Sequence, residues 1–291
     1  MDDFKGKVVI VTGAGGGIGR SHALEFAKRG AMVVVNDLGG SVAGEGASDM
    51  ADQVVDEIKA GGGIAIANKA SVSDRAGAKS IVDDAVAEFG TVDILVNNAG
   101  ILRDKSFKNM TLDDWDIVMD VHINGSAYVT HAAWPIMYAK NWGRIVFTSS
   151  TSGIFGNFGQ ANYGAAKMAM VGLMNVLEKE GASHNVRVNT LAPAAATRLT
   201  NTVPGLDEDL GHPDPARAPS LVTPAVLYMC REDAPTGKII MAGNGRFGYV
   251  GVFRNEGVEL GVDATLESLL EQEDIVTDMS QSQHSAPWAS W

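Results

Sequence analysis

The sequence KVVIVTGAGGGIG, residues 7–19, joins an apolar run with strong β propensity to a cluster of glycines, and a helical pattern follows it. The glycines are spaced as Gly13, three residues, Gly17, one residue and Gly19. A turn of this kind lets the backbone approach a pyrophosphate, and it points the free N–H groups of the next helix at the anion. A tight turn without a ligand is the alternative that the glycines alone leave open. We expect a strand, turn and helix that bind a dinucleotide.

A second apolar run, Met32 to Asn36, ends at Asp37, eighteen residues after Gly19. A carboxylate at this position can accept both ribose hydroxyls of an adenosine, and it repels a 2′-phosphate. The acidic residue therefore predicts NAD rather than NADP as the cofactor.

Ser150, Tyr163 and Lys167 are spaced so that Tyr163 and Lys167 share one helix face while Ser150 arrives from the preceding strand. A free phenol has a pKa of about 10, and a neighbouring ammonium lowers that pKa toward neutrality. The hydroxyl of Ser150 can then hold a substrate oxygen at the phenol. We predict a tyrosine base, although an exposed Tyr–Lys pair has the same spacing.

Composition limits the class of protein. The chain has 291 residues, is 45% hydrophobic and carries a formal net charge of −12, which argues against nucleic acid or an anionic membrane as a partner. No apolar stretch has the length of a membrane span, and the N-terminus lacks the apolar region of a signal peptide. We expect a soluble cytoplasmic protein with one domain over residues 1–278 and a mobile tail over 279–291.

Metal and disulfide chemistry find little support. Cys230 is the single cysteine, and the six histidines show no paired spacing. We therefore expect no disulfide framework and no metal site.

The rest of the chain alternates strand-like runs with helix-length amphipathic segments, the pattern of a parallel sheet. The further strand-like runs are residues 64–67, 94–96, 144–148, 186–191 and 238–241, and the further helical segments are 47–60, 74–89, 113–139 and 163–180. We expect an α/β fold that is Rossmann-like and doubly wound, with about seven parallel strands and helices on both faces. Its site should lie at the carboxyl ends of the strands.

The chain resembles the short-chain dehydrogenases/reductases over about residues 6 to 245. The motifs that carry this resemblance are Thr12-Gly13-x3-Gly17-x-Gly19, Asn97-Asn98-Ala99-Gly100, Ser150, Tyr163-x3-Lys167 and Pro193. Within that family it is similar to the (3R)-hydroxyacyl-CoA dehydrogenase region of the peroxisomal multifunctional enzymes of type 2, whose vertebrate form is also called 17β-hydroxysteroid dehydrogenase type 4. The strings Val35–Gly40, Asn98–Asp104 and Gly156–Tyr163 carry this narrower likeness.

The resemblance implies NAD-dependent oxidation of a (3R)-hydroxyacyl-CoA to a 3-oxoacyl-CoA, with hydride passing to C4 of the nicotinamide. Tyr163 would remove the hydroxyl proton, Ser150 would bind the substrate oxygen, and Lys167 would lower the pKa of Tyr163 and hold the nicotinamide ribose. The residues implied in cofactor binding are Gly13, Gly17, Ile18, Gly19, Asp37, Asn98, Ala99, Gly100, Tyr163, Lys167, Pro193 and Thr197. Arg103, Lys105 and Lys108 are the nearest basic residues for the CoA phosphates, although a solvated charge run explains them equally well.

Two other functions share these motifs. An NAD-linked 17β-hydroxysteroid or steroid-side-chain dehydrogenase has the same catalytic set, and a non-catalytic NAD-binding protein has the same fold. Family likeness also predicts a homodimer or homotetramer through the helix that follows Tyr163. His122 departs from the family, which usually has an asparagine there that completes a proton relay; a histidine bonded locally within its helix is the plainer interpretation.

Overall fold

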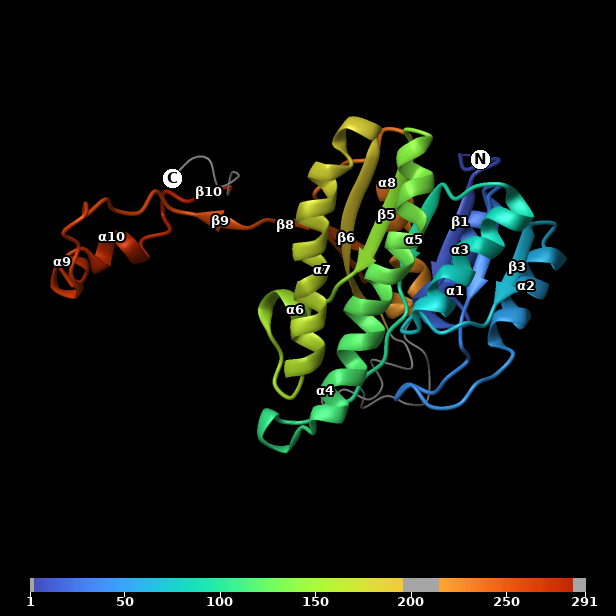
Figure 1. The fold of residues 1–291 in the computed structure, drawn as a ribbon, viewed down its shortest axis with the longest axis horizontal. Helices are drawn as coiled ribbons and strands as arrows, with labels where there is room; N and C mark the ends of the chain where they lie inside the picture. The colour runs from blue at the N-terminus through green and yellow to red at the C-terminus, as the bar shows by residue number, and fades with distance from the viewer. Residues whose placement is uncertain (1–2, 196–214, 285–291) are drawn as a thin grey trace. The chain divides into compact units, whose positions relative to one another are not determined.

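The computed structural model describes residues 3–195 and 215–284, and its larger unit is built on one sheet (Figure 1). The strands of that sheet are β1 (Val8–Thr12), β2 (Met32–Asn36), β3 (Ile64–Asn68), β4 (Ile94–Asn97), β5 (Gly143–Thr148), β6 (Val186–Ala194), β7 (Ile239–Gly243) and β8 (Arg246–Val250). Their order is β3-β2-β1-β4-β5-β6-β7-β8, and every pair from β3 to β7 is parallel. The predicted Rossmann-like sheet is confirmed.

An eighth strand extends the sheet beyond the seven predicted. Asn244 and Gly245 connect β7 to β8, with φ angles of 52° and 71°. A two-residue turn with positive φ at both positions belongs to a β-hairpin, so β8 runs antiparallel to β7. The Asn-Gly pair is the sequence signal for this hairpin.

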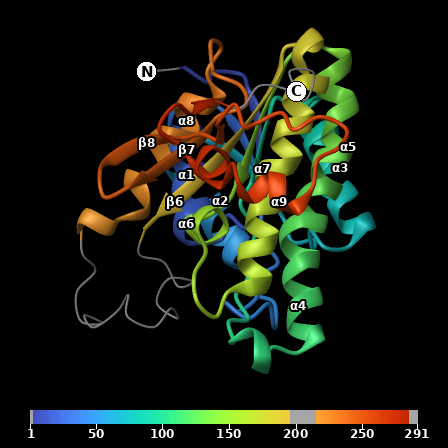
Figure 2. The same cartoon turned by 90° about the vertical axis from the view of Figure 1, so that its left-hand side faces the viewer.

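Helices cover both faces of the sheet (Figure 2). They are α1 (Gly17–Lys28), α2 (Met50–Ala60), α3 (Arg75–Phe89), α4 (Leu112–Met119), α5 (Gly125–Ala139), α6 (Thr151–Phe155), α7 (Ala161–Glu180) and α8 (Thr223–Cys230), with short 3-10 turns at Phe107–Asn109, Ala182–His184, Pro215–Arg217 and Pro219–Leu221. Helices α1, α2 and α8 pack on one face, and α3, α5 and α7 on the other. None of the helices in the described residues is long and apolar enough to cross a membrane.

The helix expected over residues 113–139 is divided. A π-helical turn, Asp120–Asn124, separates α4 from α5. Such turns insert a residue into the helical repeat and often mark functional sites. Here it contains His122.

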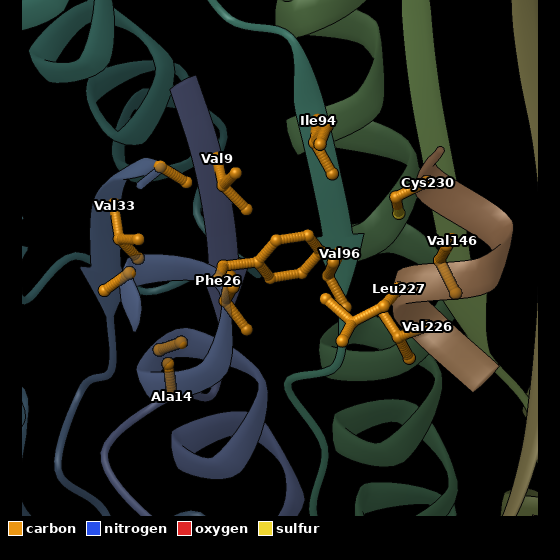
Figure 3. Close-up of a cluster of buried hydrophobic side chains, with 14 of the residues drawn as sticks. Val9, Ala14, Phe26, Val33, Ile94, Val96, Val146, Val226, Leu227 and Cys230 are labelled. Atoms are coloured by element: carbon orange, nitrogen blue, oxygen red, sulfur yellow. The ribbon is translucent and has the colours of Figure 1, made fainter. Parts of the chain in front are cut away.

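The core beneath α1 and α8 shows why the strands are apolar without interruption. Val9, Val33 and Val96 are fully buried and point toward Phe26 of α1 and Leu227 of α8 (Figure 3). The central strands β1, β4 and β5 are buried along their whole length, as expected for parallel strands covered by helices on both faces.

The chain divides by its contacts into Met1–Tyr249 and a second unit, Val250–Trp291. Within the second unit, β9 (Phe253–Arg254) pairs with β10 (Gln283–His284), and two short helices, α9 (Leu266–Leu270) and α10 (Glu273–Thr277), lie between them in sequence. Thr265 and Ser268 form a capping box at the start of α9. One domain over 1–278, with this unit as its extension, stays our prediction, and residues 285–291 of the expected tail lie outside the described chain.

Candidate active site

The glycine turn between β1 and α1 leaves no room for side chains. A Cβ on Gly13, whose φ is +64°, would lie 2.7 Å from Cα of Ala99, and a Cβ on Gly19 would lie 2.3 Å from the carbonyl oxygen of Gly13. Helix α1 starts after Gly16, which supplies no side-chain cap, so the first N–H groups of the helix are available to an anion. The turn therefore fits the pyrophosphate of a dinucleotide.

Asp37 follows β2, and the backbone holds its carboxylate at both oxygens. The N–H of Gly15 donates to Oδ2, and the N–H of Gly39 donates to Oδ1, each at 2.7 Å. A carboxylate has about four lone-pair sites, so capacity remains for two ribose hydroxyls. Asp37 cannot swing away from a 2′-phosphate without breaking these bonds.

The segment after β4 ties the cofactor turn to the strand beside it. The Asn98 side chain donates to the carbonyl oxygens of Thr12 and Gly13, at 2.9 and 3.0 Å. The Thr12 hydroxyl in turn accepts from the N–H groups of Asn98 and Ala99. The structure thus shows Asn98 bracing the glycine turn, while its contact with a cofactor stays a prediction.

Ser150, Tyr163 and Lys167 come together after β5. Ser150 caps α6, with its hydroxyl accepting from the N–H of Ser152 at 3.1 Å. Lys167 is buried, and its ammonium donates to the carbonyl oxygen of Thr148 at 2.6 Å, with Nζ 5.4 Å from the centre of the Tyr163 ring. The backbone carbonyl at the end of β5 therefore fixes the lysine.

The electrostatics of these residues differ from the sequence prediction. Burial raises the pKa of Tyr163 to about 12, although the Ser150 hydroxyl partly offsets this shift. Burial also lowers the pKa of Lys167 to about 7. The predicted lowering of the Tyr163 pKa by a charged Lys167 does not occur in the protein alone, because desolvation disfavours the charged forms of both residues.

His122 lies under the same site. Its ring meets the Tyr163 ring edge-on, with 5.2 Å between the centres, and its Nε2 lies within hydrogen-bond distance of both the N–H and the carbonyl oxygen of Ile101, at 3.1 and 2.9 Å. A Cβ on Gly100 would lie 2.4 Å from its Cε1, so only glycine fits above the ring. Burial and the nearby Lys167 hold the pKa of His122 well below its ordinary value, and its Nδ1 has no partner among the described residues.

One cleft gathers most of the predicted residues. Its lining includes Gly13, Gly17, Ile18, Gly19, Asp37, Asn98, Ala99, Gly100, Ser150, Tyr163, Lys167 and Pro193. A second cleft adjoins it at Ser150 and Tyr163 and is lined also by Phe155 and Gln160. Thr197 lies outside the described residues.

The basic residues proposed for CoA are largely paired. Arg103 donates to the carbonyl oxygen of Ala43 and pairs with Glu45, and Lys105 pairs with the buried Asp114 at 2.8 Å. These two side chains are therefore held by other groups of the protein. Asp104, which lies between them, was not predicted from the sequence; its carboxylate accepts from the Gln160 amide at 2.6 Å.

The described residues contain no group of three or more His, Cys, Asp or Glu side chains that could hold a metal ion. The side chains that line the two clefts supply hydroxyl, phenol, amine, imidazole and carboxylate groups.

Comparison with known proteins agrees with this geometry. The family model described as short chain dehydrogenase matches residues 7–209. Peroxisomal multifunctional enzyme A of Dictyostelium discoideum is 54% identical over 260 residues, which cover 88% of this chain and 57% of that protein. A Mycobacterium tuberculosis protein named short-chain type dehydrogenase/reductase Rv0148 is 45% identical over 284 residues, covering 96% of this chain and 97% of that protein.

A solved structure gives the same result. Full-length peroxisomal multifunctional enzyme type 2 from Drosophila melanogaster matches with a TM-score of 0.79 and 38% sequence identity, covering 97% of this chain and 47% of that one. The chain spans about half the length of the two multifunctional enzymes.

Proposed function

Because this chain belongs to the short-chain dehydrogenase family and is therefore an oxidoreductase, we propose that it oxidises a (3R)-hydroxyacyl-CoA to a 3-oxoacyl-CoA with NAD. One observation carries the proposal: a single cleft contains the fixed carboxylate of Asp37 and, with it, Ser150, Tyr163 and Lys167. A nicotinamide dinucleotide whose adenosine ribose meets Asp37 would extend along the glycine turn toward Tyr163.

The acyl-CoA substrate is supported by likeness. The string Gly156–Tyr163, which forms a wall of the second cleft, carries the resemblance to the hydroxyacyl-CoA dehydrogenase region, and the related Dictyostelium and Drosophila proteins are named peroxisomal multifunctional enzymes. Their names place those proteins in peroxisomes, whereas we keep a cytoplasmic location as our prediction for this chain.

The residues of the site divide the reaction between them. The substrate loses a hydride from C3 and a proton from its hydroxyl, and the carbon–oxygen single bond becomes a carbonyl. Bound NAD would supply the hydride acceptor. Tyr163 receives the proton, and Ser150 holds the substrate oxygen beside the phenol. The bond to Thr148 keeps the Lys167 amine near the Tyr163 ring.

The direction of the Tyr163 shift predicts a pH dependence. A base must be deprotonated, and burial raises the pKa of Tyr163 to about 12. Oxidation should therefore become faster as pH rises from about 7 to 9, while reduction of the 3-oxo product should change little, because the phenol that donates its proton stays protonated over this range.

A substrate panel tests the proposal. With NAD, we expect the (3R)-hydroxyacyl-CoA to be oxidised faster than its (3S) isomer and faster than an estradiol-type steroid. With each substrate, we expect NAD to be preferred to NADP. Tyr163→Phe should lower kcat by about 10³-fold, because it removes the proton acceptor and retains the ring. Preference for the steroid would favour the 17β-hydroxysteroid alternative, and intact turnover by the variant would remove the proposed base.

We also propose that the protein is a homodimer or homotetramer. Helix α7 buries Met170 and Met174 on the sheet but exposes Met168 and Val176 to 42% and 53%. A second copy of the chain against this helix would cover both exposed side chains.

A further inference from the structure

Gln160 is a buried amide in the wall of the second cleft. It is 4% exposed, and it lines that cleft together with Ser150 and Tyr163. It is also the N-cap residue of α7, three positions before Tyr163, and its side chain makes no capping hydrogen bond. The amide and the phenol line the same cleft.

Hydrogen bonds fix both ends of this amide. Its Nε2 donates to Oδ2 of Asp104 at 2.6 Å, and its Oε1 accepts from Nδ2 of Asn157 at 3.1 Å. A carboxylate only accepts, and an amide nitrogen only donates. If the Gln160 amide were rotated by 180°, its oxygen would face the Asp104 carboxylate and its nitrogen would face the Asn157 amide nitrogen. Neither contact could then be a hydrogen bond. One Nε2 hydrogen of Gln160 remains for another acceptor.

Asp104 is held in place by the backbone on either side of it. The N–H of Lys105 donates to the carbonyl oxygen of Gly159 at 2.9 Å, and the Asn162 side chain donates to the carbonyl oxygen of Arg103 at 3.2 Å. The other carboxylate oxygen of Asp104, Oδ1, is buried and has no partner among the described residues. Burying a carboxylate with a single side-chain bond costs stability, so packing alone does not account for this residue.

We propose that Gln160 binds the substrate and that Asp104 is the positioning residue that aims its free N–H at a carbonyl oxygen two carbons from the reacting hydroxyl. This inference rests on the proposed function, because a 3-hydroxyacyl thioester has such a carbonyl at C1. Its hydroxyl meets Ser150 and Tyr163, and its thioester oxygen meets the amide one helical turn away. The site would thus select β-hydroxy carbonyl compounds over simple secondary alcohols.

The test compares two substrates that differ in one group. They are a (3R)-hydroxyacyl-CoA and the matching 3-hydroxyalkyl-CoA thioether, in which CH₂ replaces the carbonyl. We expect the wild-type protein to prefer the thioester by about tenfold in kcat/KM, mainly through KM. Gln160→Met should lower kcat/KM for the thioester about tenfold and leave the thioether unchanged. Asp104→Asn should give a smaller loss, again for the thioester alone.

Exposed residues provide matched controls. Gln53→Met in α2 and Asp116→Asn in α4 make the same chemical changes away from the clefts. Neither variant should change kcat/KM for the thioester or for the thioether. Equal losses on both substrates in the Gln160 variant, or no preference in the wild type, would overturn the inference. If circular dichroism shows that Gln160→Met does not fold, the Asp104→Asn variant tests the inference with the same two substrates.

The outcomes also separate this inference from the proposed function. Turnover of the thioester without any effect of Gln160 or Asp104 removes the inference and retains the function. Turnover of neither CoA compound, with activity on another alcohol, removes the function and the inference together.

Discussion

The two ends of the active-site cleft are built in different ways. At the cofactor end, formed by the Gly13–Gly19 turn and Asp37, backbone groups set the shape: Gly19 has no space for a Cβ, and N–H groups hold both oxygens of Asp37. At the reaction end, formed by Ser150, Tyr163, Lys167 and His122, side chains set the shape, and burial shifts the pKa values of Tyr163, Lys167 and His122.

This difference predicts two kinds of response. The cofactor end depends on close approach of atoms, so substitutions there should act at every pH. The reaction end depends on which buried groups carry charge, so substitutions there should have effects that change with pH. The experiments below compare the two ends.

The largest effect is expected from Gly19→Ala. The added Cβ would lie 2.3 Å from the Gly13 carbonyl oxygen and 2.5 Å from the Asn98 amide nitrogen, so the glycine turn must move. We expect the Kd for NAD to rise about hundredfold and the free energy of unfolding to fall by roughly 1–3 kcal/mol. Fluorescence titration and denaturant unfolding measure the two quantities.

A second glycine provides the control. Gly248 is exposed in β8, and a Cβ there would meet no atom within 4 Å. Gly248→Ala should raise the free energy of unfolding by up to about 1 kcal/mol and leave NAD binding unchanged. NAD affinity that is unaffected by Gly19→Ala would contradict a cofactor end set by backbone shape.

A smaller, pH-dependent effect is expected from Lys167→Met. In the folded protein the pKa of Lys167 is about 7, below its ordinary value of 10.5, so between these two pH values the unfolded chain binds a proton that the folded chain does not. Stability of the wild type should therefore rise with pH through this window, by about 1.4 kcal/mol per unit. The variant lacks this contribution, so it should be the more stable protein at pH 7, with a difference that shrinks toward pH 10.

Urea unfolding of both proteins at pH 7, 8 and 9 measures that slope. Other titrating groups are present in both chains, so the difference between the two curves isolates Lys167. Parallel curves would show that the buried amine keeps its proton and that the reaction end is not governed by desolvation.

The sequence predicts the cofactor end well because its signals are local. The spacing of Gly13, Gly17 and Gly19 and the position of Asp37 each follow directly from one strand, and the parallel sheet follows from the alternation of strands and helices. The Tyr163–Lys167 pair is equally local, and one helix does hold both residues.

The rest of the reaction end depends on distant parts of the chain. The pKa directions come from burial by several elements, so a model of one helix with an exposed ammonium predicts the wrong sign for Tyr163. The bond between Asp104 and Gln160 joins residues 56 positions apart. The π-helical turn at Asp120–Asn124 falls within a continuous helical pattern, so periodicity alone does not reveal it.

The smallest effect is expected from substitution of His122. The effect of this substitution on activity should not depend on pH. The pKa of this histidine lies well below its ordinary value, so it stays neutral at the pH values at which the enzyme is assayed. His122→Gln keeps a polar group near the N–H of Ile101 and loses ring packing beneath Gly100. We expect a loss of about 1–2 kcal/mol in the free energy of unfolding and less than about a threefold change in kcat.

The pH dependence of kcat/KM between about 6 and 9 provides the decisive measurement, because it should have the same shape in the wild type and in His122→Gln. An ionisation near pH 6 that disappears in the variant would mean that His122 gains a proton during turnover. Nδ1, which has no partner among the described residues, would then take up the proton while Nε2 donates to the carbonyl oxygen of Ile101, and the histidine at this position would indicate a change of mechanism. An unchanged profile instead identifies His122 as a neutral support for Ile101 and the Tyr163 ring, which is the role its contacts describe.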